Sequence, residues 1–292
     1  MKQAFYRLSV IFPFILFLGL TACNEPSSMS NNYQPVQQHS PPVNSDYYFN
    51  VFGDPQNGKA VYSHLVAVAL TGANPAFTVI VGDMISSPTE VEQWPAFKAV
   101  STPLMAKGDF WVVIGNHDIE DRNSLETLRT YYPDVPESGY YARQNNGIYN
   151  IFLNSQEFDT DKITETQLDW LEQQLMHEGA SRGRIPIVYS HRPPFPQNRH
   201  KDEPFQDNEA IHELLLHYNV RLMISGHEHN YSRYERDGVT YLITGGAGAA
   251  LYTEAGDNTF YHFTRIFVGD GFLTVRIIGV FGKKYDEFKI IL

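Results

Sequence analysis

The fold is decided by a stretch near the middle of the chain, residues 110–118, which reads FWVVIGNHD. Five bulky apolar residues of high β propensity are followed at once by a glycine and three polar residues. An apolar run of this length that ends at a glycine predicts a buried strand. The three polar side chains are therefore expected at the point where that strand ends.

The same arrangement recurs at four other places along the chain. Further strands are predicted at residues 48–52, 77–81, 185–189 and 222–225, and each is followed by a short polar cluster. Helical patterns lie at residues 59–70, 90–106, 124–132, 164–177 and 207–218. Thr164 followed by Gln167 predicts a capping box for the fourth helix. Alternating strands and helices predict βαβ units with a largely parallel sheet.

After Asn230 the pattern changes to strands alone. They are expected at residues 240–244, 261–268, 273–280 and 285–291, and glycines between them indicate turns and hairpins. We therefore expect one α/β domain over residues 47–292 whose C-terminal part is antiparallel.

The N-terminal segment has a different composition. Lys2 and Arg7 precede an apolar run at residues 10–20, which is too short to span a bilayer but long enough for the core of an export signal. Small residues then lead to Cys23, the only cysteine. The pattern resembles the bacterial lipoprotein signal, which implies removal of residues 1–22 and lipid attachment at Cys23. The alternatives are a plain secretory peptide and a buried N-terminal helix.

Residues 23–46 are predicted to be a disordered tether. They are rich in Ser, Asn, Gln and Pro, and such a composition buries too little apolar surface to offset the entropy of ordering. The lipoprotein resemblance implies an exported protein that is lipid-anchored to a bacterial membrane. Asn24, directly after the anchor, favours the outer membrane or the periplasmic face over the inner membrane.

The acidic charge of the chain limits its partners. Its 292 residues include 22 Lys and Arg against 33 Asp and Glu, a formal net charge of −11. We expect no nucleic-acid partner, because displacing counterions from phosphates requires a basic surface. Small anionic substrates remain compatible, because bound divalent metals reverse the charge of a site locally. A single cysteine excludes an internal disulfide or a multi-cysteine metal cluster, so the chemistry must come from histidines and carboxylates.

The five polar clusters together carry the donor atoms of a metal site. In chain order they are Gly53-Asp54-Pro55-Gln56, Gly82-Asp83, Gly115-Asn116-His117-Asp118, Ser190-His191 and Gly226-His227-Glu228-His229. The carboxyl ends of strands in open α/β sheets line one crevice, so these segments should converge. Oxygen and imidazole ligands suit Mn, Fe, Zn or Co. The set suffices for two metal ions if one carboxylate bridges them.

These motifs resemble those of the calcineurin-like metallophosphoesterase superfamily. The resemblance runs from residue 52 to the C-terminus, and Gly-Asn-His-Asp and Gly-His-Glu-His are its most specific parts. It implies a four-layer αββα sandwich of two mixed sheets, with the metal site at the C-terminal ends of the strands. Residues 241–248 are more distantly similar to the ending of purple acid phosphatases.

The resemblance also assigns roles to single residues. One metal ion would be held by Asp54, Gln56, Asp83 and His229. Asp83 would bridge to a second ion held by Asn116, His191 and His227. His117 would contact the phosphate and protonate the leaving group. The other substrate contacts implied are Asn116, Arg192 and, less directly, Arg233.

Two positions depart from the family pattern. Many members have His where this chain has Gln56, and the harder amide oxygen favours Mn over Zn at the first site. Ser86 stands three residues after Asp83, where protein phosphatases place an Asp that orients the catalytic histidine and purple acid phosphatases place a Tyr ligand. We expect Ser86 to do neither.

The leading hypothesis is a phosphoesterase that hydrolyses small phosphomonoesters by attack of a metal-bound hydroxide at a dinuclear centre, without a covalent intermediate. The alternatives are a phosphodiesterase of the same fold and a non-catalytic surface metal-binding protein. Gly245-Gly246-Ala247-Gly248 could suggest a dinucleotide-binding oxidoreductase, but no helix is predicted after it. His200 is a further candidate for substrate contact. Tyr131, Tyr132, Tyr140 and Tyr141 could wall a substrate pocket.

Overall fold

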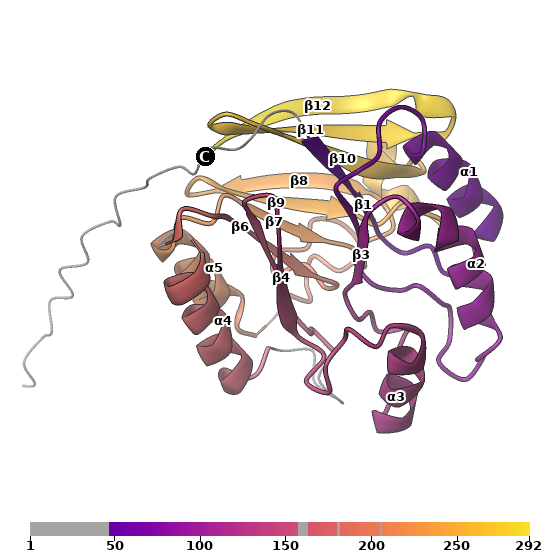
Figure 1. Ribbon diagram of the computed structural model, residues 1–292, viewed down its shortest axis with the longest axis horizontal. Coiled ribbons are helices and arrows are strands. Elements are labelled where there is room, and N and C mark those ends of the chain that lie inside the picture. The colour runs from indigo at the N-terminus through magenta and orange to yellow at the C-terminus, as the bar shows by residue number, and fades with distance from the viewer. Residues whose placement is uncertain (1–46, 157–162, 180–181, 205) are drawn as a thin grey trace, which may run out of the picture. The chain divides into compact units, whose positions relative to one another are not determined.

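The apolar runs that precede the polar clusters form the parallel centres of two mixed sheets (Figure 1). The structure, a computed structural model, describes residues 47–156, 163–179, 182–204 and 206–292. The predicted signal, the tether and Cys23 lie outside the described residues. Among the helices that are described, none combines the length and the apolar character needed to cross a membrane.

The first sheet has the order β12-β11-β10-β1-β2-β3. Its parallel part consists of β1 (Tyr47–Phe52), β2 (Phe77–Ile80) and β3 (Asp109–Val112). An antiparallel meander follows from β10 (His262–Gly269) through β11 (Phe272–Gly279) to β12 (Lys284–Ile291). The meander joins the parallel part because β10 pairs with β1, with Val51 opposite Thr264. The short 3-10 segments η2 (Thr253–Asn258) and η3 (Val280–Gly282) flank these late strands.

The second sheet has the order β4-β5-β6-β7-β9-β8. Four strands are parallel: β5 (Ile148–Phe152), β6 (Ile185–Ser190), β7 (Leu222–Ser225) and β9 (Val239–Thr244). The antiparallel edges are β4 (Tyr141–Asn145) and β8 (Tyr231–Arg236). The expectation of a wholly antiparallel C-terminal part was therefore wrong for β9, which runs parallel to β7.

Helices cover the outer faces of both sheets and complete the four layers (Figure 1). On one side lie α1 (Lys59–Ala69) and α2 (Gln93–Met105), with α3 (Arg122–Tyr131) below them, and on the other lie α4 (Glu165–Glu178) and α5 (Asn208–His217). The predicted αββα sandwich of two mixed sheets is confirmed. Thr164 caps α4 by accepting from the Gln167 N–H, and a reciprocal capping box is formed at α3 by Asp121 and Ser124.

The main core lies between the two sheets and extends under α1 and α2. Trp111 of β3 meets Phe152 of β5 at 5.9 Å between ring centres, and Phe152 stacks on Tyr189 of β6 at 5.1 Å. Each fully buried side chain of this size contributes about 1.5–3 kcal/mol to stability. A second cluster packs α4 and α5 on the outer face of the second sheet, through residues such as Leu171 and Leu215. The two sheets are thus packed against each other through a shared apolar core.

Candidate active site

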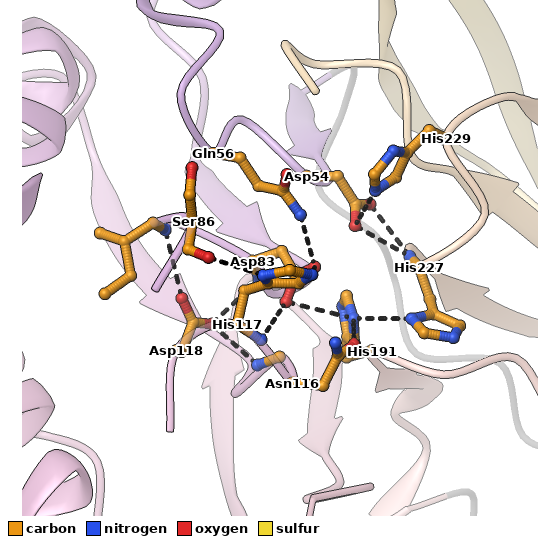
Figure 2. Close-up of polar contacts among 12 residues, drawn as sticks. Asp54, Gln56, Asp83, Ser86, Asn116, His117, Asp118, His191, His227 and His229 are labelled. Carbon is orange, nitrogen blue, oxygen red and sulfur yellow. Dashed lines mark hydrogen bonds and ion pairs between the residues drawn. The ribbon is translucent and has the colours of Figure 1, made fainter. Parts of the chain in front are cut away.

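The polar clusters after β1, β2, β3, β6 and β7 meet at one place, as predicted (Figure 2). Eight non-glycine residues in the described part of the chain have a positive φ, and half of them belong to these clusters. They are Asp54 (59°), Gln56 (38°), Asp83 (54°) and His227 (68°). Left-handed backbone is costly for residues with a side chain and persists where the surroundings enforce it. Backbone strain is therefore concentrated where the side chains converge.

The glycines that begin the clusters allow this convergence. A Cβ atom at Gly115 would lie 2.2 Å from Asp83 Oδ1, and one at Gly82 would lie 2.4 Å from His191 Nδ1. Neither position can carry a side chain while Asp83 and His191 stay where they are. The glycine of FWVVIGNHD thus serves the close approach of two loops.

One group of donor atoms surrounds His191 Nε2. His191 Nδ1 lies 2.9 Å from the Val81 carbonyl, which can only accept, so Nδ1 is a donor here and Nε2 is the nitrogen that faces the site. This Nε2 lies 2.9 Å from Asn116 Oδ1 and 3.3 Å from Asp83 Oδ1. His227 Nδ1 lies 3.2 Å away. The nitrogen and both oxygens are electron donors, so this cluster is suited to a cation.

The protonation of His227 agrees with that role. Burial first, and then the charges of His191 and Arg192, hold the pKa of His227 well below its usual value. The imidazole is therefore neutral near pH 7, which is the form that binds metals. Arg192 Nη1 lies 3.2 Å from His227 Nε2, so this arginine reaches the edge of the site.

A second group consists of Asp54, Asp83 and His229, whose ligand atoms all lie within 4.8 Å of one another. His229 Nδ1 donates to the Ala250 carbonyl at 2.9 Å, which leaves Nε2 facing Asp54 Oδ1 at 3.6 Å. Burial raises the pKa of Asp54. Burial alone would lower the pKa of His229, but the hydrogen bond and charge of Asp54 raise it overall. The two shifts have different causes, since loss of water raises the pKa of Asp54 and the neighbouring carboxylate raises that of His229, but both show that this buried pocket favours a positive charge beside Asp54.

Asp83 belongs to both donor groups and is almost fully buried. The donors also match the oxygen and imidazole preferences of divalent Mn, Fe or Zn. The residues present therefore fit two divalent cations that share the Asp83 carboxylate.

Gln56 lies beside the group formed by Asp54, Asp83 and His229, with its Nε2 donating to Asp83 Oδ2 at 2.9 Å. Rotation of the amide about its last bond would exchange the nitrogen and the oxygen. Gln56 is thus in reach of the site, and its role as a metal ligand stays a prediction.

His117 is oriented by the main chain of Ser86. Its Nδ1 donates to the Ser86 carbonyl at 2.7 Å, and its Nε2 points toward Asp83 Oδ2 at 4.0 Å. The Ser86 side chain does not orient the histidine, as expected, because its hydroxyl makes no hydrogen bond with the described residues; the main-chain carbonyl of the same residue does so instead. The Ser86 N–H is fixed in turn by Gln93 Oε1 at 2.7 Å. The His117 side chain is 43% exposed and so is open to a substrate.

Two buried carboxylates of the motifs were given no role from the sequence. Asp118 accepts hydrogen bonds from the N–H groups of Asp83 (2.9 Å), Gly115 (2.8 Å), Met84 (2.8 Å) and Ile85 (3.4 Å). It thereby ties the loop after β2 to the loop after β3. The sequence did contain a signal for this role, because Asp118 ends a motif that begins with a glycine and follows a buried strand. A carboxylate buried at such a place has to accept hydrogen bonds from main-chain N–H groups.

Glu228 is the other carboxylate, and it is fully buried between two predicted metal ligands. It accepts from the N–H groups of Gln197 (3.1 Å), Asn198 (3.0 Å) and His200 (3.1 Å). The loop held in this way places the His200 ring 4.4 Å from that of His227. His200 therefore lies beside a predicted metal ligand, and its contact with substrate stays a prediction.

Two of the predicted substrate features lie elsewhere. The Arg233 guanidinium packs over the Phe288 ring at 4.1 Å and pairs with Asp286 at 3.7 Å, so it is engaged with β12. Three of the four tyrosines (Tyr131, Tyr132 and Tyr141) line a cavity of about 210 Å³ between α2, α3 and β3, and Tyr140 packs on Trp170. No predicted metal ligand lines that cavity.

The sandwich and the two neighbouring donor groups place this protein among the α/β proteins that have a candidate dinuclear metal site at the strand ends. The model of the family described as Calcineurin-like phosphoesterase matches residues 47–231, and the chain belongs to this family.

Known relatives are similar over part of their length. Purple acid phosphatase 22 of Arabidopsis thaliana is 25% identical over 68% of this chain and 47% of its own length. Purple acid phosphatase 15 of the same plant is 30% identical over 53% of this chain and 32% of its own length. A nucleotide pyrophosphatase/phosphodiesterase of Hordeum vulgare is 25% identical over 72% and 70%. The chain thus spans about half or less of the two purple acid phosphatases.

Solved structures share the fold. Purple acid phosphatase PPD1 from yellow lupin (Lupinus luteus) superposes with a TM-score of 0.71 at 19% identity, covering 87% of this chain and 55% of that one. GAP50, the anchor in the inner membrane complex of Plasmodium, superposes with a TM-score of 0.63 at 15% identity, covering 85% and 90%.

Proposed function

We propose that this protein is a metal-dependent phosphoesterase that hydrolyses small phosphomonoesters at a dinuclear centre. The observation that carries the proposal is the sharing of Asp83 between two groups of buried donor atoms. Family membership and the relatives named as phosphatases support it. The acidic chain favours small esters over long polyanions, which its charge would repel.

Divalent cations bound at the two donor groups would supply Lewis acidity to the phosphate oxygens and to an attacking water. The chain's own residues would do the remaining work. His117 is held by the Ser86 carbonyl through Nδ1, and in its protonated form it also carries a proton on Nε2. That proton would pass to the departing ester oxygen. Arg192, beside His227, would bind a phosphate oxygen.

A second candidate is a phosphodiesterase using the same residues. The similarity to the barley protein named as a nucleotide pyrophosphatase/phosphodiesterase favours it, because that match covers 70% of the relative. Comparing a monoester with a diester of the same leaving group separates the two. A non-catalytic role is the third candidate, since the fold is shared with an anchor protein.

The direct test is the release of para-nitrophenol from its phosphate ester in the presence of Mn²⁺. The wild-type protein is expected to be active, and Asp83→Asn is expected to lose activity because it weakens both metal sites. Asp270→Asn, in the exposed turn between β10 and β11, is the matched control and should retain activity. Wild-type protein that is inert with Mn²⁺, Fe²⁺ and Zn²⁺ would contradict the proposal.

We also propose that the protein is exported and lipid-anchored through Cys23, facing an extracytoplasmic compartment. The support is the charged N-terminus, the apolar run and the single cysteine after small residues. Cys23→Ser should release the domain from the membrane fraction or leave its signal uncleaved. Unchanged membrane fractionation and unchanged mass of this variant would rule out the anchor.

A further inference from the structure

A cavity of about 190 Å³ lies beside Gln56, between the start of α1 and the middle of α2. Its apolar wall includes Tyr62 and Phe97, whose rings stack at 5.5 Å, and Val100. Its polar part includes Gln56, Lys59 and Gln93. We call this space the α1–α2 cavity.

The α1–α2 cavity adjoins the side of the site that carries the proton donor. Figure 2 shows Ser86 to the left of Asp83 and Gln56 above it, with His227 and His229 to the right. Gln56 Nε2 and His117 Nε2 both flank the same atom, Asp83 Oδ2, at 2.9 and 4.0 Å.

A second wall residue is linked to His117 as well. Gln93 Oε1 accepts from the Ser86 N–H, and the Ser86 carbonyl accepts from His117 Nδ1. A leaving group that takes its proton from His117 would depart on this side of Asp83. Gln56 and Gln93, which both line the cavity, are therefore hydrogen-bonded to residues that surround the departing oxygen.

The size and lining of the cavity indicate which leaving group it suits. An apolar cavity of about 150 Å³ holds a benzene molecule, so the space beside Gln56 can take one six-membered ring. Stacked aromatic side chains and a valine favour a flat apolar group. Lys59 lines the cavity at the start of α1, is exposed, and has no acidic residue beside it in the first turn of the helix. Its ammonium group is therefore placed to meet a polar substituent on the ring.

We propose that the α1–α2 cavity binds the leaving group of the substrate, and that the substrate class is aryl phosphates with a single ring. This inference rests on the phosphoesterase activity proposed above. In the reaction, the bond between phosphorus and the aryl oxygen breaks while water oxygen bonds to phosphorus and releases one proton to the solvent, from which His117 is later reprotonated. The phenolic oxygen receives the proton of His117, and the resulting phenol remains in the cavity until it is released.

The test compares the binding of phenylphosphonate with that of methylphosphonate, measured by calorimetry on the full chain with added Mn²⁺. Neither compound is hydrolysed, so the readout does not depend on turnover. Wild-type protein should bind the phenyl compound at least about tenfold more tightly, because the ring is buried. Ala96→Phe fills the cavity from α2 and should abolish this preference while leaving the affinity for methylphosphonate unchanged.

Ala99→Phe is the matched control, because Ala99 is exposed on the same helix and does not line the cavity. It should behave like the wild-type protein. Val100→Ala enlarges the cavity and should improve binding of 1-naphthylphosphonate relative to phenylphosphonate. This second variant keeps the test valid if Ala96→Phe folds poorly.

The outcomes separate the inference from the proposed function. Ester hydrolysis without any phenyl preference, or an equal preference in all variants, would overturn the cavity assignment and leave the phosphoesterase standing. A phenyl preference that Ala96→Phe abolishes, in a protein that hydrolyses no ester, would support the binding site and overturn the activity. Failure to bind either phosphonate would overturn both.

Discussion

Replacing Asp118 by asparagine should destabilise the protein at the junction of two site loops. Each carboxylate oxygen accepts two main-chain N–H groups, Oδ2 from Asp83 and Gly115 and Oδ1 from Met84 and Ile85. An asparagine keeps one such oxygen and turns an NH₂ group toward the other pair of N–H donors. Two hydrogen bonds are lost in either orientation of the amide.

The expected cost follows from the charge and burial of Asp118. A hydrogen bond to a charged group contributes about 1.5–3 kcal/mol, so two lost bonds cost about 3–6 kcal/mol. Burial, together with the nearby Asp83, raises the pKa of Asp118, while the N–H groups of Gly115 and Met84 oppose this shift. Removing the charge recovers part of that burial cost. We therefore expect a loss near the lower end, about 3 kcal/mol.

Urea unfolding followed by tryptophan fluorescence measures this loss. At a slope of about 3 kcal/mol per molar urea, the midpoint of Asp118→Asn should fall by about 1 M. Asp121→Asn is the control, because Asp121 is the exposed N-cap of α3 and asparagine caps helices equally well. An Asp118→Asn protein with the wild-type midpoint would refute the idea that this carboxylate holds the two loops together.

Two further predictions concern residues around the metal ligands. Gln56→His should make the metal site of Asp54, Asp83 and His229 retain more Zn²⁺ during dialysis against a chelator, because imidazole binds zinc better than an amide oxygen does. Equal retention of zinc by Gln56→His and by Gln56→Ala, compared with the wild-type protein, would show that residue 56 is not a ligand. Glu228→Gln removes one acceptor from the loop that carries His200, so the KM for para-nitrophenyl phosphate should rise by roughly tenfold with kcat largely kept. A fall in kcat at constant KM would instead place Glu228 in the chemical step.

Much of the fold could be predicted because its central strands are encoded by short, local patterns in the sequence. The strands at the site are short apolar runs that end at glycine or serine, and the structure moves their bounds by no more than two residues. The hairpin of β4 and β5 was missed although Asn146-Gly147 is a strong turn signal, with φ of 45° and 86°. The edge strand β8 was missed because its exposed face carries charged residues such as Arg233 and Glu235.

The arrangement of strands within the sheets is harder to predict because it depends on long-range pairing. Nothing local in β9 indicates that it lies parallel to β7 instead of joining the antiparallel meander. The same limit applies to the site. Ligand side chains are recognisable by type and spacing, but the contact that orients His117 uses a main-chain carbonyl, which every residue possesses.

The most direct test of the two-metal account is an anomalous diffraction measurement on crystals soaked with Mn²⁺. Two peaks about 3.5–4 Å apart are expected, as in other two-metal sites. One should lie among Asp54, Asp83 and His229, and the other among Asp83, Asn116, His191 and His227. A single peak, or two peaks that do not share Asp83, would contradict it.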